Sequence, residues 1–117
     1  MLQADLVKAN PNSPKLVCII DSGISIKHPD LCGRADNCTS RITSTPLRSY
    51  SSFTSTYGPV MDPFEDTYGQ GTHVAGTIAA LNNGQGVVGL SGNGVKLHIV
   101  KIFGTGILMP ITTPFGC

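Results

Sequence analysis

Two ionisable side chains occupy positions that suit proton-transfer chemistry, and the first is Asp21. It ends the apolar run "KLVCIID", residues 15–21, and precedes Ser22 and Gly23. Functional groups gather at the carboxyl ends of strands in open α/β sheets, and a carboxylate there can orient a histidine and stabilise its charged form. The alternative for Asp21 is a turn-forming residue that simply follows a strand.

The second is His73, which lies in "GQGTHVAG", residues 69–76. It is either a proton-transfer group or a helix residue whose ring is satisfied by local hydrogen bonds. The glycines around it loosely resemble a dinucleotide-binding fingerprint, but that motif must directly follow a strand. The preceding residues, "DPFEDTY", are acidic and turn-like, so we do not expect nucleotide binding.

Three segments must position these side chains. The continuous apolar run at residues 15–21 predicts a strand buried on both faces, as in a parallel sheet, and residues 95–104 predict a second buried strand. Residues 72–83 predict a helix capped by Thr72 and ended by an Asn/Gly cluster. Gly76 inside that helix indicates close packing against a neighbour. The order strand, loop, helix, loop, strand is typical of a three-layer α/β sheet.

The intervening segments show little periodicity. Residues 22–31 predict a loop in which Pro29 stops any helix. Residues 33–67 are rich in Ser, Thr, Pro and Gly, which predicts mostly loop with a short strand near residues 41–44. His28 belongs to the "HPD" turn and His98 to a strand, and neither position suggests chemistry.

Composition excludes several functions. The 117 residues have 40% hydrophobic and 13% charged side chains with a net charge of +1. That is too apolar for a disordered chain, and it gives no basic field for nucleic acid. No apolar run approaches the roughly 18 residues that span a membrane. The N-terminal residues show no signal-peptide pattern.

The four cysteines, Cys18, Cys32, Cys38 and Cys117, include no C-x-x-C pair, so we expect no zinc site. Cys18 lies in an apolar run, so we expect it to be a small core residue. Cys32 and Cys38 flank a turn-rich loop and could bridge in an oxidising compartment. Connectivity does not follow from the sequence, so both states of this pair stay open.

Three stretches together resemble the subtilisin-like serine peptidases. These are "VCIIDSGISIKHPDL" (17–31), "GTHVAGTIAALNNGQGVVG" (71–89) and "VKLHIVKIFG" (95–104). The resemblance implies a doubly wound, three-layer, mostly parallel sheet that is truncated here. It divides the chain into an N-terminal extension (1–14), a partial peptidase domain (15–104) and a divergent tail (105–117). It also implies protein or peptide substrates and an extracellular or vacuolar location.

Residue-by-residue transfer gives Asp21 the role of the family's catalytic aspartate. The family's pattern H-G-T-H-V-A-G places its catalytic histidine first, and Gln70 occupies that slot. His73 matches the second histidine, which is not the general base. No serine lies in the family's G-T-S-x-A-x-P context. An amide has no useful basicity, so the serine hydroxyl would lack its base.

His73 is not expected to replace that base. It lies one helical turn away, a shift of roughly 5 Å, whereas a base must come within about 3 Å of the hydroxyl. The sequence therefore predicts a chain that hydrolyses nothing as written.

The resemblance also implies a structural calcium site. Its oxygen ligands would be the Asp30 carboxylate, the Asn83 side chain and the backbone carbonyls of Leu81, Gln85 and Val87. Calcium takes 6 to 8 oxygens, largely from such loops, and glycines at 84, 86 and 89 suit a tight turn. The family's N-terminal ligand has no match, because Gln3 lies at too short a spacing. The alternative is a plain glycine-rich loop.

Two other hypotheses about the function stay open. One is a non-catalytic homologue that acts as a calcium-binding or protein-binding module. The other is an incomplete record of an active peptidase, in which Gln70 stands in place of a histidine.

Overall fold

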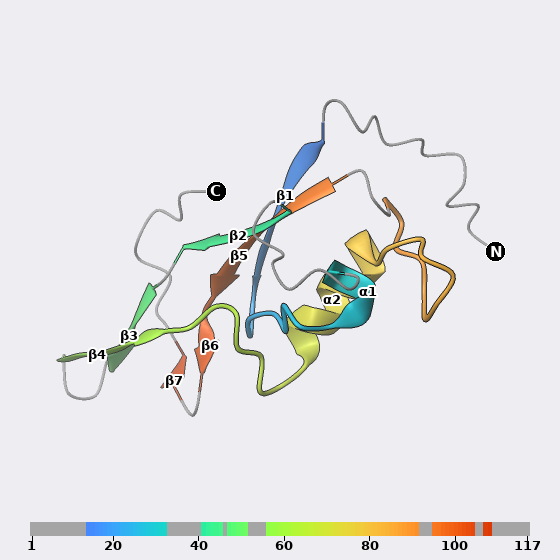
Figure 1. The fold of residues 1–117 in the computed structure, drawn as a ribbon. Coiled ribbons are helices and arrows are strands. Elements are labelled where there is room, and N and C mark those ends of the chain that lie inside the picture. The colour runs from blue at the N-terminus through green and yellow to red at the C-terminus, as the bar shows by residue number, and fades with distance from the viewer. Residues whose placement is uncertain are drawn as a thin grey trace.

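The computed structural model describes residues 14–32, 41–45, 47–51, 56–91, 95–104 and 107–108. Its central element is a three-stranded sheet of order β1-β5-β2, made of β1 (Lys15–Asp21), β5 (Val95–Lys101) and β2 (Ile42–Thr45). Both pairings are parallel, and crossover segments separate the strands in sequence (Figure 1). The predicted parallel α/β sheet is confirmed, as are strands at residues 15–21 and near residues 41–44.

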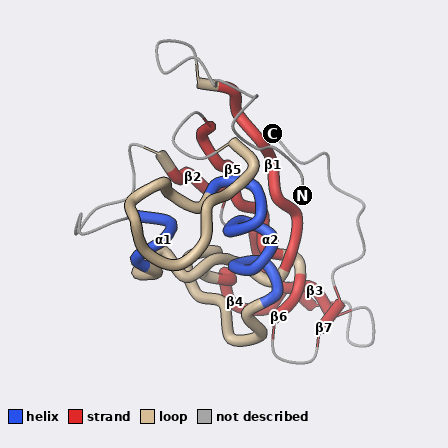
Figure 2. The backbone as a smooth tube through the Cα atoms, turned by 90° about the vertical axis from the view of Figure 1, so that its right-hand side faces the viewer, coloured by secondary structure: helices blue, strands red, loops and turns tan. Residues whose placement is uncertain are grey.

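Two helices cover one side of this sheet: α1 (Pro29–Cys32) and α2 (Gln70–Ala79) (Figures 1 and 2). The core between them and the sheet includes Ile19, Leu97 and Ile99. Ala75 and Ala79 are fully buried on the inner side of α2. Their small side chains let the helix lie close to the strands, so the turn that follows β1 can reach the start of α2.

The opposite side of the sheet differs from expectation. Leu16 is 57% exposed and Ile20 is 43% exposed, whereas Ile19 between them is buried. Alternate residues of a strand point to opposite faces, so β1 buries one face only. The prediction of a strand buried on both faces was therefore wrong for β1 in the part of the chain that is described.

Two antiparallel pairs complete the described elements. One joins β3 (Leu47–Ser51) to β4 (Thr56–Met61), and the other joins β6 (Phe103–Gly104) to β7 (Ile107–Leu108). The expectation that residues 33–67 are mostly loop missed the first pair, because its strands lack the alternating apolar pattern. None of the described helices is long and apolar enough to cross a membrane.

The ends of both helices also differ from expectation. Helix α2 begins at Gln70 after Gly69, which has a φ of 78°, so Thr72 lies inside the helix. It ends at Ala79, before the Asn/Gly cluster. Pro29 begins α1 and does not prevent it, since proline fits the first helical position, where no amide hydrogen bond is needed.

Arg41, just before β2, holds the last turns of both helices. Its Nη1 donates to the carbonyl oxygen of Leu31 at 2.7 Å, and its Nη2 donates to that of Ala79 at 2.6 Å. Helix carbonyls at this end lack partners within the helix and carry partial negative charge. Burial lowers the pKa of the Arg41 guanidinium, which nevertheless stays charged at neutral pH.

The cysteines within the described residues, Cys18 and Cys32, are both disulfide-bonded. Cys18 is half-buried on β1 and its sulfur is part of a disulfide, so the expectation of a simple core residue was wrong. The sequence left the pairing of Cys32 with Cys38 open, and Cys38 lies outside the described ranges.

Candidate functional site

The carboxyl edge of the sheet brings Asp21 beside a residue that the sequence analysis did not single out. Asp21 and Lys101 are register partners at the ends of β1 and β5. Lys101 is only 6% exposed, and its Nζ donates to the carbonyl oxygen of Glu65 at 2.6 Å. The Asp21 Oδ1 accepts the Ser22 N–H at 2.7 Å. Asp21 therefore lies at the strand end that the α/β rule predicts.

The first turn of α2 contacts the turn that follows β1. The Gly71 N–H donates to Ser22 Oγ at 3.0 Å. A Cβ on Gly71 would collide with the Gly23 carbonyl oxygen, so the two backbones touch. Gln70 precedes Gly71, and Asp21 precedes Ser22. The two positions that the sequence analysis paired are thus brought into neighbouring segments.

A carboxylate between them, Asp66, organises this junction. Its Oδ1 accepts the Ser22 hydroxyl at 2.8 Å and the Gly69 N–H at 2.9 Å. Its Oδ2 accepts the Thr72 N–H at 2.8 Å and the Thr72 hydroxyl at 2.5 Å. Thr72 Oγ1 in turn accepts the Ser25 N–H at 2.9 Å. Asp66 thus satisfies amides at the start of α2 that have no partner within the helix.

These contacts set the protonation of Asp66. Partial burial by itself would raise the pKa of its carboxyl. The hydrogen bonds from Thr72, Ser22 and Gly69 outweigh burial and hold that pKa below its ordinary value. Asp66 is therefore a carboxylate at neutral pH, and it places a negative charge at the positive end of the helix dipole.

The segment that carries Asp66 is itself fixed to the sheet. The Ile24 N–H donates to the Pro63 carbonyl oxygen at 2.9 Å. A Cβ on Gly23, whose φ is 113°, would collide with the Glu65 carbonyl oxygen. Together with the Lys101 hydrogen bond, these contacts join residues 62–66 to the ends of β1 and β5.

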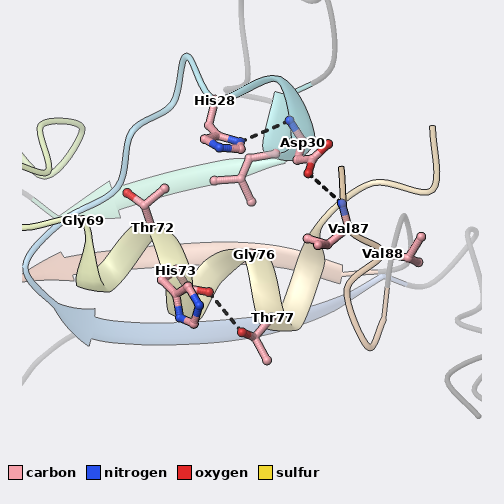
Figure 3. A pocket seen from close by; sticks show the side chains of 10 residues that line it. His28, Asp30, Gly69, Thr72, His73, Gly76, Thr77, Val87 and Val88 are labelled. Carbon is pink, nitrogen blue, oxygen red and sulfur yellow. Dashed lines mark hydrogen bonds between the residues drawn. The ribbon is translucent and has the colours of Figure 1, made fainter. Parts of the chain in front are cut away.

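His73 lies away from this junction, on the exposed side of α2. The Thr77 hydroxyl donates to the His73 carbonyl oxygen at 3.1 Å, and the ring lines a pocket of about 490 Å³. Figure 3 shows His73 and Thr77 on one wall and His28 and Asp30 on the other. His28 Nδ1 accepts the Asp30 N–H at 3.3 Å, which caps α1. His98 contacts Thr43 through its Nδ1 at 3.0 Å.

Residues 81–88 wrap around the side chain of Asp30, which is only 7% exposed. The Val87 N–H donates to Asp30 Oδ2 at 3.0 Å (Figure 3). A Cβ on Gly86 would collide with both carboxylate oxygens. Asn83 Oδ1 accepts the Gln85 N–H at 3.0 Å, which tightens the same loop. Four of the predicted ligand residues thus lie in one loop, and Gly86 and Val87 of that loop contact the predicted carboxylate.

Both ends of this loop are anchored. At its start, the Leu81 N–H donates to the Asp30 carbonyl oxygen at 2.7 Å. At its end, the N–H groups of Gly89, Leu90 and Ser91 donate to carbonyls of Ala80, Thr77 and Ile78. A Cβ on Gly89 would collide with the Ala80 amide nitrogen, so the chain can pack against the end of α2 here only with a glycine. The loop is therefore closed on the last turn of α2.

The packing expected for Gly76 was wrong. A Cβ at Gly76 would meet nothing within 4 Å, and the residue lines the open pocket. Among the described residues, no group of three or more His, Cys, Asp or Glu side chains is placed to hold a metal ion. A site built from one carboxylate and loop oxygens is a different arrangement.

Comparison with known proteins agrees with this geometry. Residues 13–112 match the profile of the Subtilase family, so the chain belongs to that family. The crystal structure of the psychrophilic subtilisin-like protease Apa1 from the Antarctic psychrotroph Pseudoalteromonas sp. AS-11 superposes with a TM-score of 0.61 at 29% identity. It covers 94% of this chain and 22% of that one, which confirms the subtilisin-like fold.

Curated relatives are also similar in sequence. Subtilisin-like protease 1 of Plasmodium vivax is 39% identical over 106 residues, covering 83% of this chain and 16% of that protein. Subtilisin amylosacchariticus of Bacillus subtilis subsp. amylosacchariticus is 41% identical over 86 residues, covering 74% of this chain and 18% of that protein. The chain thus spans less than a fifth of the length of these two relatives.

Proposed function

We propose that this chain is a non-hydrolytic subtilase segment, in which Gln70 replaces the general base. The observation that carries the proposal is the position of Gln70. It begins α2, one residue before the Gly71 amide that binds Ser22, and Ser22 follows Asp21. By the family resemblance this is the histidine slot, and the Gly71–Ser22 hydrogen bond supports the proposal because it brings the two segments together. A glutamine amide there cannot take a proton from a hydroxyl near neutral pH.

The magnitude of the loss follows from the chemistry. General-base assistance is worth about 10²–10⁴ in rate, and triad members act as a unit. Nearby His73 does not restore it, since its ring lines the pocket on the exposed side of α2. Peptide substrates, which the family's activity implies, would therefore pass unhydrolysed.

The test is incubation with casein and a chromogenic peptide, with and without a serine-reactive fluorophosphonate. We expect no turnover above background. Turnover that the fluorophosphonate abolishes would contradict the proposal. Trypsin in the same buffer controls for substrate quality, and an identical preparation without the chain measures background hydrolysis.

A second candidate function, structural calcium binding, is favoured by the enclosure of Asp30. A carboxylate that is only 7% exposed needs hydrogen bonds or a cation to offset its burial. The Asp30 side chain accepts the Val87 N–H, and among the described residues no lysine or arginine is paired with it. The Asn83 side chain and the carbonyls of Leu81, Gln85 and Val87 belong to the loop around it. These are oxygen donors of the kind that Ca²⁺ prefers, so the residues fit this ion.

Melting curves with and without calcium test this second function. A ligand that binds only the folded state raises its stability, by about 2.7 kcal/mol at a concentration 100 times Kd. We expect calcium to raise Tm, and Mg²⁺ at equal concentration to raise it less. We expect Asp30→Asn to abolish the calcium effect. A Tm that calcium does not change would contradict calcium binding.

A further inference from the structure

We propose that Asp66 is a positioning residue that holds residue 70 beside Asp21, and that this arrangement persists although the histidine is replaced. The inference rests on the proposed function in one respect: position 70 is taken as the family's histidine slot. It adds a residue and a test that do not depend on turnover.

The Asp66 carboxylate connects two segments of the chain. The Asp66 carboxylate accepts four hydrogen bonds, from Ser22, Gly69 and the amide and hydroxyl of Thr72. Ser22 comes from the turn after β1, and the other two flank residue 70 in sequence. One carboxylate therefore bridges the two segments that carry positions 21 and 70.

Two hydroxyl groups add further hydrogen bonds between these segments. The Ser22 hydroxyl donates to Asp66 and also accepts the Gly71 N–H at 3.0 Å. Thr72 Oγ1 donates to Asp66 and accepts the Ser25 N–H at 2.9 Å. Each hydroxyl thus uses both its donor and its acceptor capacity, and the Ser22–Asp66, Gly71–Ser22 and Ser25–Thr72 bonds join the two segments. A shift of α2 along its axis would break several of these bonds at once.

None of these contacts uses the side chain at position 70. Gln70 is exposed, and the frame around it consists of backbone amides, hydroxyls and one carboxylate. Replacement of the histidine therefore removes the imidazole but none of the hydrogen bonds that hold this part of the backbone in place. An imidazole restored at this position would find the Asp21 carboxylate within reach.

The experiment is an NMR pH titration of the imidazole introduced by Gln70→His, with His28, His73 and His98 as internal references. Among the described residues, the ionisable groups on the segments that meet here are Asp21 on β1, Asp66 and Glu65 on residues 62–69, Lys101 on β5 and His73 on α2. The carboxylates raise the imidazole pKa and the Lys101 ammonium opposes them. We expect the introduced imidazole to titrate at least about one pH unit above 6.5.

Second substitutions then separate positioning from simple charge. Asp21→Asn in the Gln70→His background should return the imidazole pKa to near its ordinary value. Asp66→Asn should lower it substantially, and Glu65→Gln, which removes an equal charge from an exposed neighbour, should lower it far less. Ser22→Ala keeps every charge and removes only the hydroxyl bridge. Positioning predicts that it also lowers the imidazole pKa, whereas a charge effect alone predicts no change.

Two outcomes would overturn the inference. The first is an introduced imidazole that titrates at its ordinary pKa in a folded Gln70→His protein, which would place position 70 out of reach of Asp21. The second is a raised pKa that neither Asp66→Asn nor Ser22→Ala changes. If Asp66→Asn does not fold, Ser22→Ala carries the test. Turnover by the unmodified chain would refute the proposed function and leave the titration result standing.

Discussion

Asp66 binds Thr72 twice, through the backbone N–H at 2.8 Å and the side-chain hydroxyl at 2.5 Å. This pair of contacts places a capping carboxylate four residues before the start of α2. The segment between them turns back at Gly69, whose positive φ brings its own N–H to the same carboxylate. The start of α2 is therefore defined by a residue outside the helix.

The Asp66 contacts predict an acid-sensitive contribution to stability. Because the folded-state pKa of Asp66 is lowered, its contribution is complete above the unfolded-state pKa of about 3.9 and is lost as pH falls through the folded value. We expect Asp66→Asn to cost about 1–2 kcal/mol at pH 7, and less at pH 3. Urea unfolding across this range measures the difference. Glu65→Gln is the control, and an equal cost at both pH values would contradict the role of ionised Asp66.

Gly76→Ala should stabilise the protein. A Cβ at this position meets nothing within 4 Å, and alanine is favoured over glycine in a helix by about 1 kcal/mol. The matched control is Gly71→Ala in the same helix, where the Cβ would collide with the Gly23 carbonyl oxygen and destabilise the fold. Urea midpoints should therefore move in opposite directions. A loss of stability in both variants would show that the space beside Gly76 is filled.

Gly86→Ala should weaken calcium-dependent stabilisation. Its Cβ would collide with the Asp30 carboxylate, and its φ of 59° adds backbone strain of roughly 1–2 kcal/mol. Gly84→Ala has similar strain at a φ of 76° but meets nothing within 4 Å. The increase in Tm on adding calcium should fall in Gly86→Ala and survive in Gly84→Ala. Equal losses would mean that backbone strain explains both.

Arg41→Met should destabilise the protein by about 2–3 kcal/mol, because it leaves the Leu31 and Ala79 carbonyls without their charged donor. Arg41→Lys keeps the charge but not the planar fork that reaches two carbonyls. We expect it to recover only part of the loss, as measured by urea unfolding. A lysine variant as stable as the original protein would show that charge alone suffices.

The sequence allowed the parallel sheet and the position of Asp21 at the end of a strand to be predicted, because that strand lies in a continuous apolar run. Asp66 was missed since it lies in "DPFEDTY", which carries no periodicity, and its role appears only when Ser22 comes close in three dimensions. Arg41 was missed for the same reason, because its partners are far away in sequence.

The predicted start of α2 was wrong for a local reason. Thr72 suits an N-cap by residue type, but Asp66 supplies the carboxylate and moves the start of α2 to Gln70. The exposure of Leu16 and Ile20 also could not be predicted, since an apolar run does not tell which neighbours will cover it.

The closed loop at residues 81–88 has an entropic consequence. Fixing the backbone of a residue costs about 1–2 kcal/mol in lost conformational freedom. Here the Leu81 N–H is fixed to Asp30, and three consecutive amides, those of Gly89, Leu90 and Ser91, are fixed to the last turn of α2. An ion that binds in this loop has only the interior residues to immobilise, because ring closure is already complete before it arrives. Affinity would then depend on the oxygens offered and little on the length of the loop.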